Sequence, residues 1–296
     1  MEEGRPSFTA IGSAMLRAAH LLWDDSPKIF EDTFALALSG SSGEVALRER
    51  LNAVVAEFTA RFGGDLAQAA LNSSRSAVVM RSRYVEEELD QAIKRGIAQY
   101  VILGAGLDSF AYRKPEVANV LRVFEVDYPA TQVWKRSRLR ELNVDTPPNL
   151  VFVPVDFEKQ PLTERLKDSG YRAEAAGFFS WLGVTIYLTR EAIFDTLRTV
   201  ASMAQGTEII FQYSPPGALV DDKARQIQEL FADLGASRGE PYLTFFEPAK
   251  LTEQVRGAGF AEVWDLGPEE ANARYFANRA DGLGMTADHH FMRARV

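Results

Sequence analysis

Cysteine is absent from this sequence, and histidine is scarce, with three residues among 296. Without cysteine the chain forms no disulfide, binds no metal through a thiolate and has no cysteine nucleophile. The three histidines, His20, His289 and His290, do not have the spacing of metal ligands. We therefore expect no bound metal, and no histidine falls convincingly in a loop that the sequence predicts to form a site.

Long hydrophobic runs and an excess of basic residues are also missing. No apolar stretch reaches the ~20 residues of a transmembrane helix, and the segment Met-Glu-Glu-Gly-Arg-Pro does not resemble a secretory signal. Acidic residues outnumber basic ones by 41 to 33, for a net charge of −8. This balance disfavours nucleic acid and anionic membranes as partners, and the basic cluster at 134–140 is expected to be a solvated helix face. We expect a cytoplasmic protein, and the sequence does not indicate its oligomeric state.

Three common catalytic motifs do not occur in the chain. There is no Gly-x-Ser-x-Gly elbow, no His-Glu-x-x-His segment and no Gly-x-x-x-x-Gly-Lys-Ser/Thr loop. Hydrolase, metalloprotease and phosphoryl-transfer functions therefore lack the residues on which they usually depend.

What the sequence does contain is a change of pattern near residue 96. The preceding region reads as three helices, of which the first is capped by Thr9 and the others cover about 44–62 and 66–94. Short apolar segments then alternate with amphipathic ones. The expected strands are 100–103, 122–126, 150–155, 177–181, 208–213, 261–266 and 290–294. The expected helices between them are 129–142, 163–168, 190–203, 221–234 and 248–258.

This alternation predicts an α/β fold of the Rossmann-like type. We expect a mainly parallel seven-stranded sheet with helices on both faces and an antiparallel last strand. Residues 1–296 are expected to form one domain, with a helical N-terminal cap or lid at 1–95 and the Rossmann-like core at 96–296. Ligands of such sheets bind at the carboxyl ends of the strands, so the residues just after each strand are the candidates for a site.

The first predicted strand ends in a glycine pair that favours a nucleoside ligand. Gly104, Ala105 and Gly106 form a tight turn, and Asp108 at its end caps the next helix or pairs with an ammonium group. Ser109 occupies the place of the third glycine of the dinucleotide fingerprint, which argues against a diphosphate.

Carboxylates follow the next two predicted strands. Roughly 20 residues after the glycine pair come Glu125 and Asp127, and a carboxylate there takes the ribose hydroxyls; Asp127 is preferred and Glu125 is second. Asp156 and Phe157 follow the third strand, where an acid and an aromatic ring suit an adenine. The alternative interpretation of that pair is a capping aspartate beside a core phenylalanine.

Three segments together carry a resemblance to a known family. They are Val-Ile-Leu-Gly-Ala-Gly-Leu-Asp-Ser-Phe-Ala-Tyr-Arg at 101–113, Phe-Glu-Val-Asp-Tyr-Pro at 124–129 and Gly-Val-Thr-Ile-Tyr-Leu-Thr at 183–189. In this order and spacing they resemble the leucine carboxyl methyltransferase family, and more its bacterial branch, which includes natural-product O-methyltransferases. The resemblance implies a class I methyltransferase that uses S-adenosylmethionine.

The resemblance also implies roles for individual residues. Gly104 and its neighbours would line the methionine end of the cofactor, Asp127 would contact the ribose, and Asp156 with Phe157 would lie at the adenine. Arg81 would pair with the cofactor carboxylate, with Arg83 as the neighbouring candidate.

One position departs from the family pattern. Leu182 stands where several members carry a glutamate. A polar contact near the methyl group or the substrate is therefore missing, or it is supplied by Ser180 or Thr185.

We expect methyl transfer to an oxygen atom of a small molecule or a peptide terminus. A carboxylate acceptor is already ionised at neutral pH, whereas a hydroxyl needs a base, and the lack of a histidine in the predicted site loops favours a carboxylate. Helices at about 7–38 are expected to cover the site. Candidates for the substrate wall are Tyr187, Tyr213, Arg113 and Arg274. The alternatives are a nicotinamide-dependent oxidoreductase and a nucleoside-binding protein without catalysis.

Overall fold

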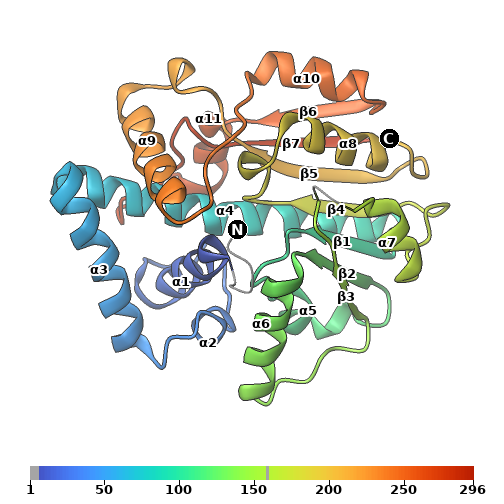
Figure 1. Cartoon of the computed structure of the whole chain (residues 1–296), viewed down its shortest axis with the longest axis horizontal. Coiled ribbons are helices and arrows are strands. Elements are labelled where there is room, and N and C mark those ends of the chain that lie inside the picture. Colours follow the sequence, from blue (N-terminus) through green and yellow to red (C-terminus); the bar gives the residue numbers. More distant parts are fainter. Residues whose placement is uncertain (1–6, 158–159) are drawn as a thin grey trace.

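The computed structural model describes residues 7–157 and 160–296 (Figure 1). Within these ranges seven strands form one sheet in the order β3-β2-β1-β4-β5-β7-β6. The pairs β1–β2, β2–β3, β1–β4 and β4–β5 are parallel, whereas β7 runs antiparallel to both β5 and β6. The Rossmann-like fold predicted from the sequence is therefore confirmed.

The elements alternate along the chain as expected. The strands are β1 (Gln99–Leu103), β2 (Arg122–Asp127), β3 (Leu150–Pro154), β4 (Phe178–Trp181), β5 (Glu208–Tyr213), β6 (Glu262–Leu266) and β7 (His290–Arg295). The helices are α1 (Phe8–Trp23), α2 (Ala35–Leu38), α3 (Glu44–Phe62), α4 (Gly64–Lys94), α5 (Phe110–Arg113), α6 (Pro129–Glu141), α7 (Leu162–Asp168), α8 (Arg190–Ala201), α9 (Asp222–Ser237), α10 (Pro248–Gly257) and α11 (Pro268–Ala271). Short turns of other helix types are η1 (Pro115–Val117), η2 (Thr185–Tyr187), η3 (Gly217–Leu219) and η4 (Asn272–Phe276).

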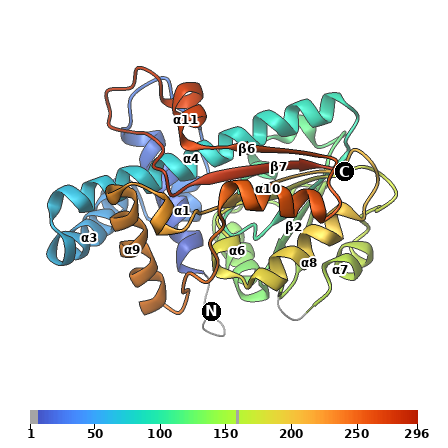
Figure 2. The same cartoon turned by 90° about the horizontal axis from the view of Figure 1, so that it is seen from above.

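The central strands are apolar on both faces because helices cover both. Successive residues of a strand point to opposite faces. On β1, Tyr100 and Ile102 join a core with side chains of α4, α5 and α6. Val101 and Leu103 join a second core with α7, α8 and α10. Figure 2 shows α4 on one side of the sheet and α8 and α10 on the other.

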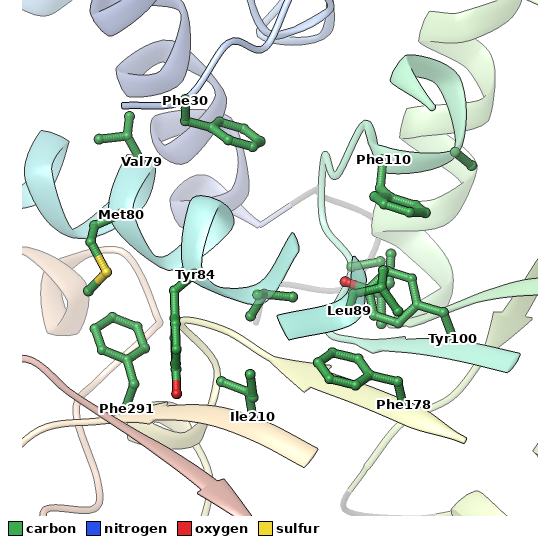
Figure 3. Packing of buried hydrophobic residues seen from close by; sticks show 14 of the residues in the cluster. Phe30, Val79, Met80, Tyr84, Leu89, Tyr100, Phe110, Phe178, Ile210 and Phe291 are labelled. Carbon is green, nitrogen blue, oxygen red and sulfur yellow. The ribbon is translucent and has the colours of Figure 1, made fainter. Parts of the chain in front are cut away.

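Aromatic rings fill much of the first core (Figure 3). The ring of Tyr84, on α4, lies 6.2 Å from that of Phe291 on β7. Tyr100 makes edge contacts with Phe110 at 5.1 Å and with Phe178 at 5.8 Å. Such edge-to-face contacts add to the stabilisation from burial of the rings, so the core fixes α4 firmly across the sheet.

The N-terminal helices form a separate cluster beside the sheet (Figure 1). Helices α1, α2 and α3 share one apolar core, and α3, the start of α4 and α9 share another. Helix α4 belongs to both parts because its second half packs on the sheet. No helix in the described ranges is both long enough and apolar enough to cross a membrane.

Two local expectations were wrong. Helix α1 is capped by Ser7 rather than Thr9, because the Ser7 hydroxyl accepts a hydrogen bond from the backbone N–H of Ala10 at 3.3 Å. The sequence pattern also missed α11 and the π-helical turn η4, which lie in the long connection between β6 and β7. These short segments have too few turns to show a helical period.

Candidate functional site

A cavity of about 740 Å³ lies at the carboxyl ends of the parallel strands. Its walls come from the segments after β1 to β5, from α1, α4 and α9, and from the loop that precedes β7. The volume lies within the ~300–1,000 Å³ of small-molecule sites. Ten of the residues predicted to bind the cofactor or the substrate line it: Arg81, Gly104, Ala105, Gly106, Asp108, Asp127, Asp156, Phe157, Tyr187 and Tyr213.

The turn after β1 leaves room only for glycine. Gly104 and Gly106 have φ angles of +66° and +51°, which side-chain-bearing residues rarely adopt. A Cβ on Gly104 would overlap the side chain of Val184, and one on Gly106 would lie 3.1 Å from the Cβ of Ala10. Both glycines also line the cavity, where the lack of a side chain allows a ligand to approach the backbone closely.

Asp127 is the last residue of β2, and its carboxylate lies next to that turn. Its carboxylate accepts hydrogen bonds from the backbone N–H of Gly106 and, at 2.6 Å, from that of Tyr128. Burial raises the pKa of Asp127 to about 6, against the effect of those two bonds. A carboxylate held in this way at a strand end suits a vicinal diol, whose hydroxyls donate to its remaining lone pairs.

Arg81 reaches the cavity from α4. Its guanidinium donates to Gln212 Oε1 at 2.9 Å and to Ser13 Oγ at 3.1 Å, and it lies directly under Gly183. Among the described residues no carboxylate forms an ion pair with it, and burial, followed by the charge of Arg17, lowers its pKa to about 10. A buried cation without a counter-charge is costly, so this arrangement fits an anionic group of a ligand.

The segment after β3 forms the far end of the cavity. The ring of Phe157 lies 6.1 Å from that of Trp181 at a tilted angle, which fixes one aromatic face. The backbone N–H of Asp156 donates to Gln160 Oε1 at 3.2 Å. An apolar ring beside a carboxylate is an arrangement that a purine base could use.

Other predicted site residues lie outside the cavity lining. Glu125 forms a buried ion pair at 2.5 Å with Lys135 of α6, and burial raises its pKa to about 7. Ser180 shares a hydrogen bond of 2.9 Å with the hydroxyl of Tyr100 inside the core. Arg113 is held by an ion pair with Glu86. Each side chain is already bound by a partner from a neighbouring element, so the structure does not bring these three to the site.

Of the remaining candidates, two lie away from the cavity and two line it. Arg83 and Arg274 both bind Glu87 on the outer side of α4, away from the cavity. Leu182 does line the cavity. Thr185 cannot replace the family glutamate because its hydroxyl donates to the backbone oxygen of Gln212 at 2.5 Å. With Ser180 also occupied, the wall at Leu182 is apolar.

The sequence analysis missed His289, which lines the cavity. Its Nδ1 lies 3.2 Å from Nε2 of Gln212, and its Nε2 lies 3.6 Å from the carboxylate of Asp288. Burial is the largest cause of its lowered pKa, ahead of the opposing charge of Asp288. One signal was present in the sequence. An antiparallel last strand must begin at the edge where its parallel neighbours end, so the residue before β7 lies at the site.

Helix α1 forms one wall of the cavity. Glu240 accepts hydrogen bonds from the first backbone N–H groups of the helix, those of Phe8 at 3.2 Å and Thr9 at 3.4 Å. The rings of Tyr187 and Tyr242 line the same cavity, and their centroids lie 5.5 Å apart. A negative charge at a helix N-terminus is stabilising, so Glu240 ties α1 to the segment that follows α9.

The comparison with protein families agrees with this geometry. The family described as leucine carboxyl methyltransferase matches residues 10–201. The chain belongs to the leucine carboxyl methyltransferase family. The resemblance inferred from the three sequence segments is therefore confirmed.

Relatives of known sequence support this family assignment. A Bacillus subtilis protein named "Putative S-adenosyl-L-methionine-dependent methyltransferase YktD" is 32% identical, over 99% of each chain. A Mycobacterium avium protein of the same description is 27% identical over 84% of this chain and 82% of its own.

Two crystal structures show the same fold at low identity. A Thermobifida fusca protein gives a TM-score of 0.58 at 15% identity, over 99% of this chain and 96% of its own. A DUF574 family protein from Streptomyces avermitilis gives 0.56 at 15% identity, over 96% of both chains. At this identity the likeness concerns the architecture alone.

Proposed function

We propose that this protein, a methyltransferase by family, transfers the methyl group of S-adenosylmethionine to an oxygen atom of a small molecule or a peptide terminus. The observation that carries the proposal is Arg81, a buried cation without an ion-pair partner among the described residues, which lines the same cavity as the glycine turn and Asp127. An amino acid joined to a nucleoside has the matching groups: a carboxylate, a diol and a base.

Each part of that ligand has a candidate partner in the cavity. Arg81 would bind the carboxylate of the methionine part, while Asp108, which follows the glycine turn and lines the cavity, would attract its ammonium group. Asp127 would accept the ribose hydroxyls, and Phe157 with Asp156 would hold the adenine. Arg17 cannot serve in place of Arg81, because it is bound to Asp32 at 2.7 Å.

The protein has to orient the acceptor and exclude water. When bound, S-adenosylmethionine supplies a methyl group activated by the sulfonium, so the chain need not activate the donor. Holding the acceptor oxygen in line supplies about 7–11 kcal/mol of the barrier in favourable cases. We propose that residues 1–95 act as a cap on the core at 96–296 within one domain, with the contact between Glu240 and the start of α1 keeping the cavity closed.

The class of acceptor has to be reconsidered in view of His289. The preference for a carboxylate rested on the lack of a histidine near the site, and His289 lines the cavity. That argument therefore no longer separates a carboxylate from a hydroxyl. Oxygen remains the proposed acceptor atom in either case.

Calorimetric titration with S-adenosylhomocysteine tests the proposal, with NAD titrated in parallel. We expect binding of S-adenosylhomocysteine that is weakened at least tenfold in Asp127→Ala and unchanged in Arg83→Met, a substitution on the outer side of α4. Incubation with methyl-labelled S-adenosylmethionine and an acceptor library then shows the product. Esters are labile to mild base, whereas ethers are stable. Binding of NAD instead, or of neither ligand, would contradict the proposal.

A further inference from the structure

His289 is placed by two neighbours that also define its protonation. Gln212 donates through Nε2 to its Nδ1, because the Oε1 of Gln212 is occupied by Arg81. The neutral imidazole therefore carries its proton on Nε2, on the side of Asp288, at 3.6 Å. The one basic lone pair of the ring is therefore on Nδ1, where it accepts from Gln212, and the carboxylate of Asp288 can stabilise a positive charge on the ring.

The imidazole lies at the cavity surface rather than in the core. Its side chain is 19% exposed, while that of Asp288 behind it is 5% exposed. The ionisable groups that act on it are Asp288, Arg81 and His290. Burial most of all lowers the pKa of His289 against the opposing charge of Asp288, and Arg81 and His290 lower it further, which favours the neutral ring.

The fixed charges that act on the His289 ring are one carboxylate, Asp288, and one guanidinium, Arg81. Glu240 lines the same cavity as a second carboxylate, together with the rings of Tyr187 and Tyr242. Among the described residues of the lining, the arginines are Arg17 and Arg81, and none is a lysine. Arg17 is bound to Asp32, and Arg81 is assigned to the cofactor carboxylate. An anionic acceptor would therefore meet like charges without a cation to bind it.

We propose that the methyl acceptor is a hydroxyl group of an aromatic or otherwise apolar molecule without an anionic group, and that His289 is the general base that takes its proton. The inference rests on the proposed function, because it assumes methyl transfer to oxygen. It replaces the carboxylate expected from the sequence.

The step balances without a further reactant. The acceptor hydroxyl donates to Nδ1 of His289 in place of the Gln212 amide, and its proton passes to that nitrogen. A lone pair of the oxygen forms the new bond to the methyl carbon as the carbon–sulfur bond breaks, and that electron pair stays on sulfur. The products are the methyl ether, a neutral thioether and an imidazolium beside Asp288, which then releases its proton to water.

Nuclear magnetic resonance gives a readout that is independent of turnover. The chain has three histidines, so single substitutions assign their ring signals. In protein saturated with S-adenosylhomocysteine we expect His289 to be neutral at pH 7 with the proton on Nε2. Naphthol should shift its signals and bind about tenfold more tightly than naphthoate, which has a similar shape but carries a charge.

Kinetics then separate a base from a positioning residue. With a hydroxyl acceptor found in the library, His289→Asn should lower kcat about 100- to 10,000-fold. Its KM and the affinity for S-adenosylhomocysteine should stay within about threefold, since asparagine can still accept from Gln212. The rate of the wild type should rise with pH to a plateau, whereas the residual rate of His289→Asn should keep rising as the acceptor itself ionises. Arg83→Met is the control, because Arg83 binds Glu87 on the outer side of α4, outside the cavity lining, and its loss should leave kcat unchanged.

The outcomes separate this inference from the proposed function. Ester products only, naphthoate bound more tightly than naphthol, a charged His289 at pH 7, or full activity in His289→Asn would each overturn the inference and leave the methyltransferase intact. Failure to bind S-adenosylhomocysteine would overturn the proposed function itself. Base-stable ethers together with a loss of kcat in His289→Asn would establish both.

Discussion

Replacing Arg81 with methionine should weaken cofactor binding strongly without weakening the fold. Methionine keeps an apolar stem of similar length but removes the charge and both hydrogen bonds, to Gln212 and to Ser13. Removing one partner of a buried, hydrogen-bonded charge pair costs about 2–5 kcal/mol of binding free energy. The affinity for S-adenosylhomocysteine should therefore fall between about 30-fold and several thousand-fold, at about 1.4 kcal/mol for each tenfold change.

Arg81→Met should not lower the free energy of unfolding in the way that it lowers the free energy of binding. The lowering of the pKa of Arg81 to about 10 corresponds to at most about 3 kcal/mol by which the folded protein disfavours this charge. Part of that free energy is offset by the loss of two hydrogen bonds, at about 1 kcal/mol each. Without ligand, Arg81→Met should therefore unfold at the same urea concentration as the wild type or slightly above it.

Two assays test this pairing of effects. Calorimetry measures the affinity for S-adenosylhomocysteine, and urea denaturation followed by circular dichroism measures the free energy of unfolding. Arg83→Met is the matched control, two positions along α4, where the side chain is 50% exposed and binds Glu87. If Arg81→Met bound S-adenosylhomocysteine within threefold of the wild type, or if Arg83→Met lost as much affinity, the assignment of the carboxylate to Arg81 would be refuted.

Three further predictions concern the glycine turn, the ribose site and the buried ion pair. Gly104→Ala should cost about 2–5 kcal/mol of unfolding free energy, since it adds left-handed strain and overlap with Val184; a urea midpoint equal to that of the wild type would contradict this. Because the pKa of Asp127 is raised to about 6 and diol binding needs the ionised form, S-adenosylhomocysteine affinity should fall about tenfold per pH unit below 6. Without ligand the sign reverses, and the contribution of Asp127 to stability should rise as pH falls from 6 towards 4; an affinity independent of pH between 5 and 8 would contradict the assignment. Lys135→Met should cost about 3–5 kcal/mol by leaving Glu125 unpaired, with cofactor affinity retained; substituting both residues by apolar ones should recover most of the loss.

The sequence alone determined those features of the protein that depend on residues close together along the chain. A strand, a glycine turn and a carboxylate at the end of the next strand are set within short segments, so the turn at Gly104 and Gly106 and the position of Asp127 could be predicted. The alternation of strands and helices likewise predicted the sheet and its antiparallel last strand. Even the family could be recognised from three short segments.

What only the tertiary structure decided is which distant side chains meet at the cavity and which are bound elsewhere. Glu125 and Asp127 differ little in sequence, yet Lys135 of α6 holds the first in the core and leaves the second at the site. Gln212 from β5 joins Arg81 from α4 to His289 before β7, a contact across more than 70 residues in each direction. No local pattern encodes such a contact, because it depends on how the sheet and the N-terminal helices pack together. Packing therefore decided which charged side chains and which histidine line the cavity.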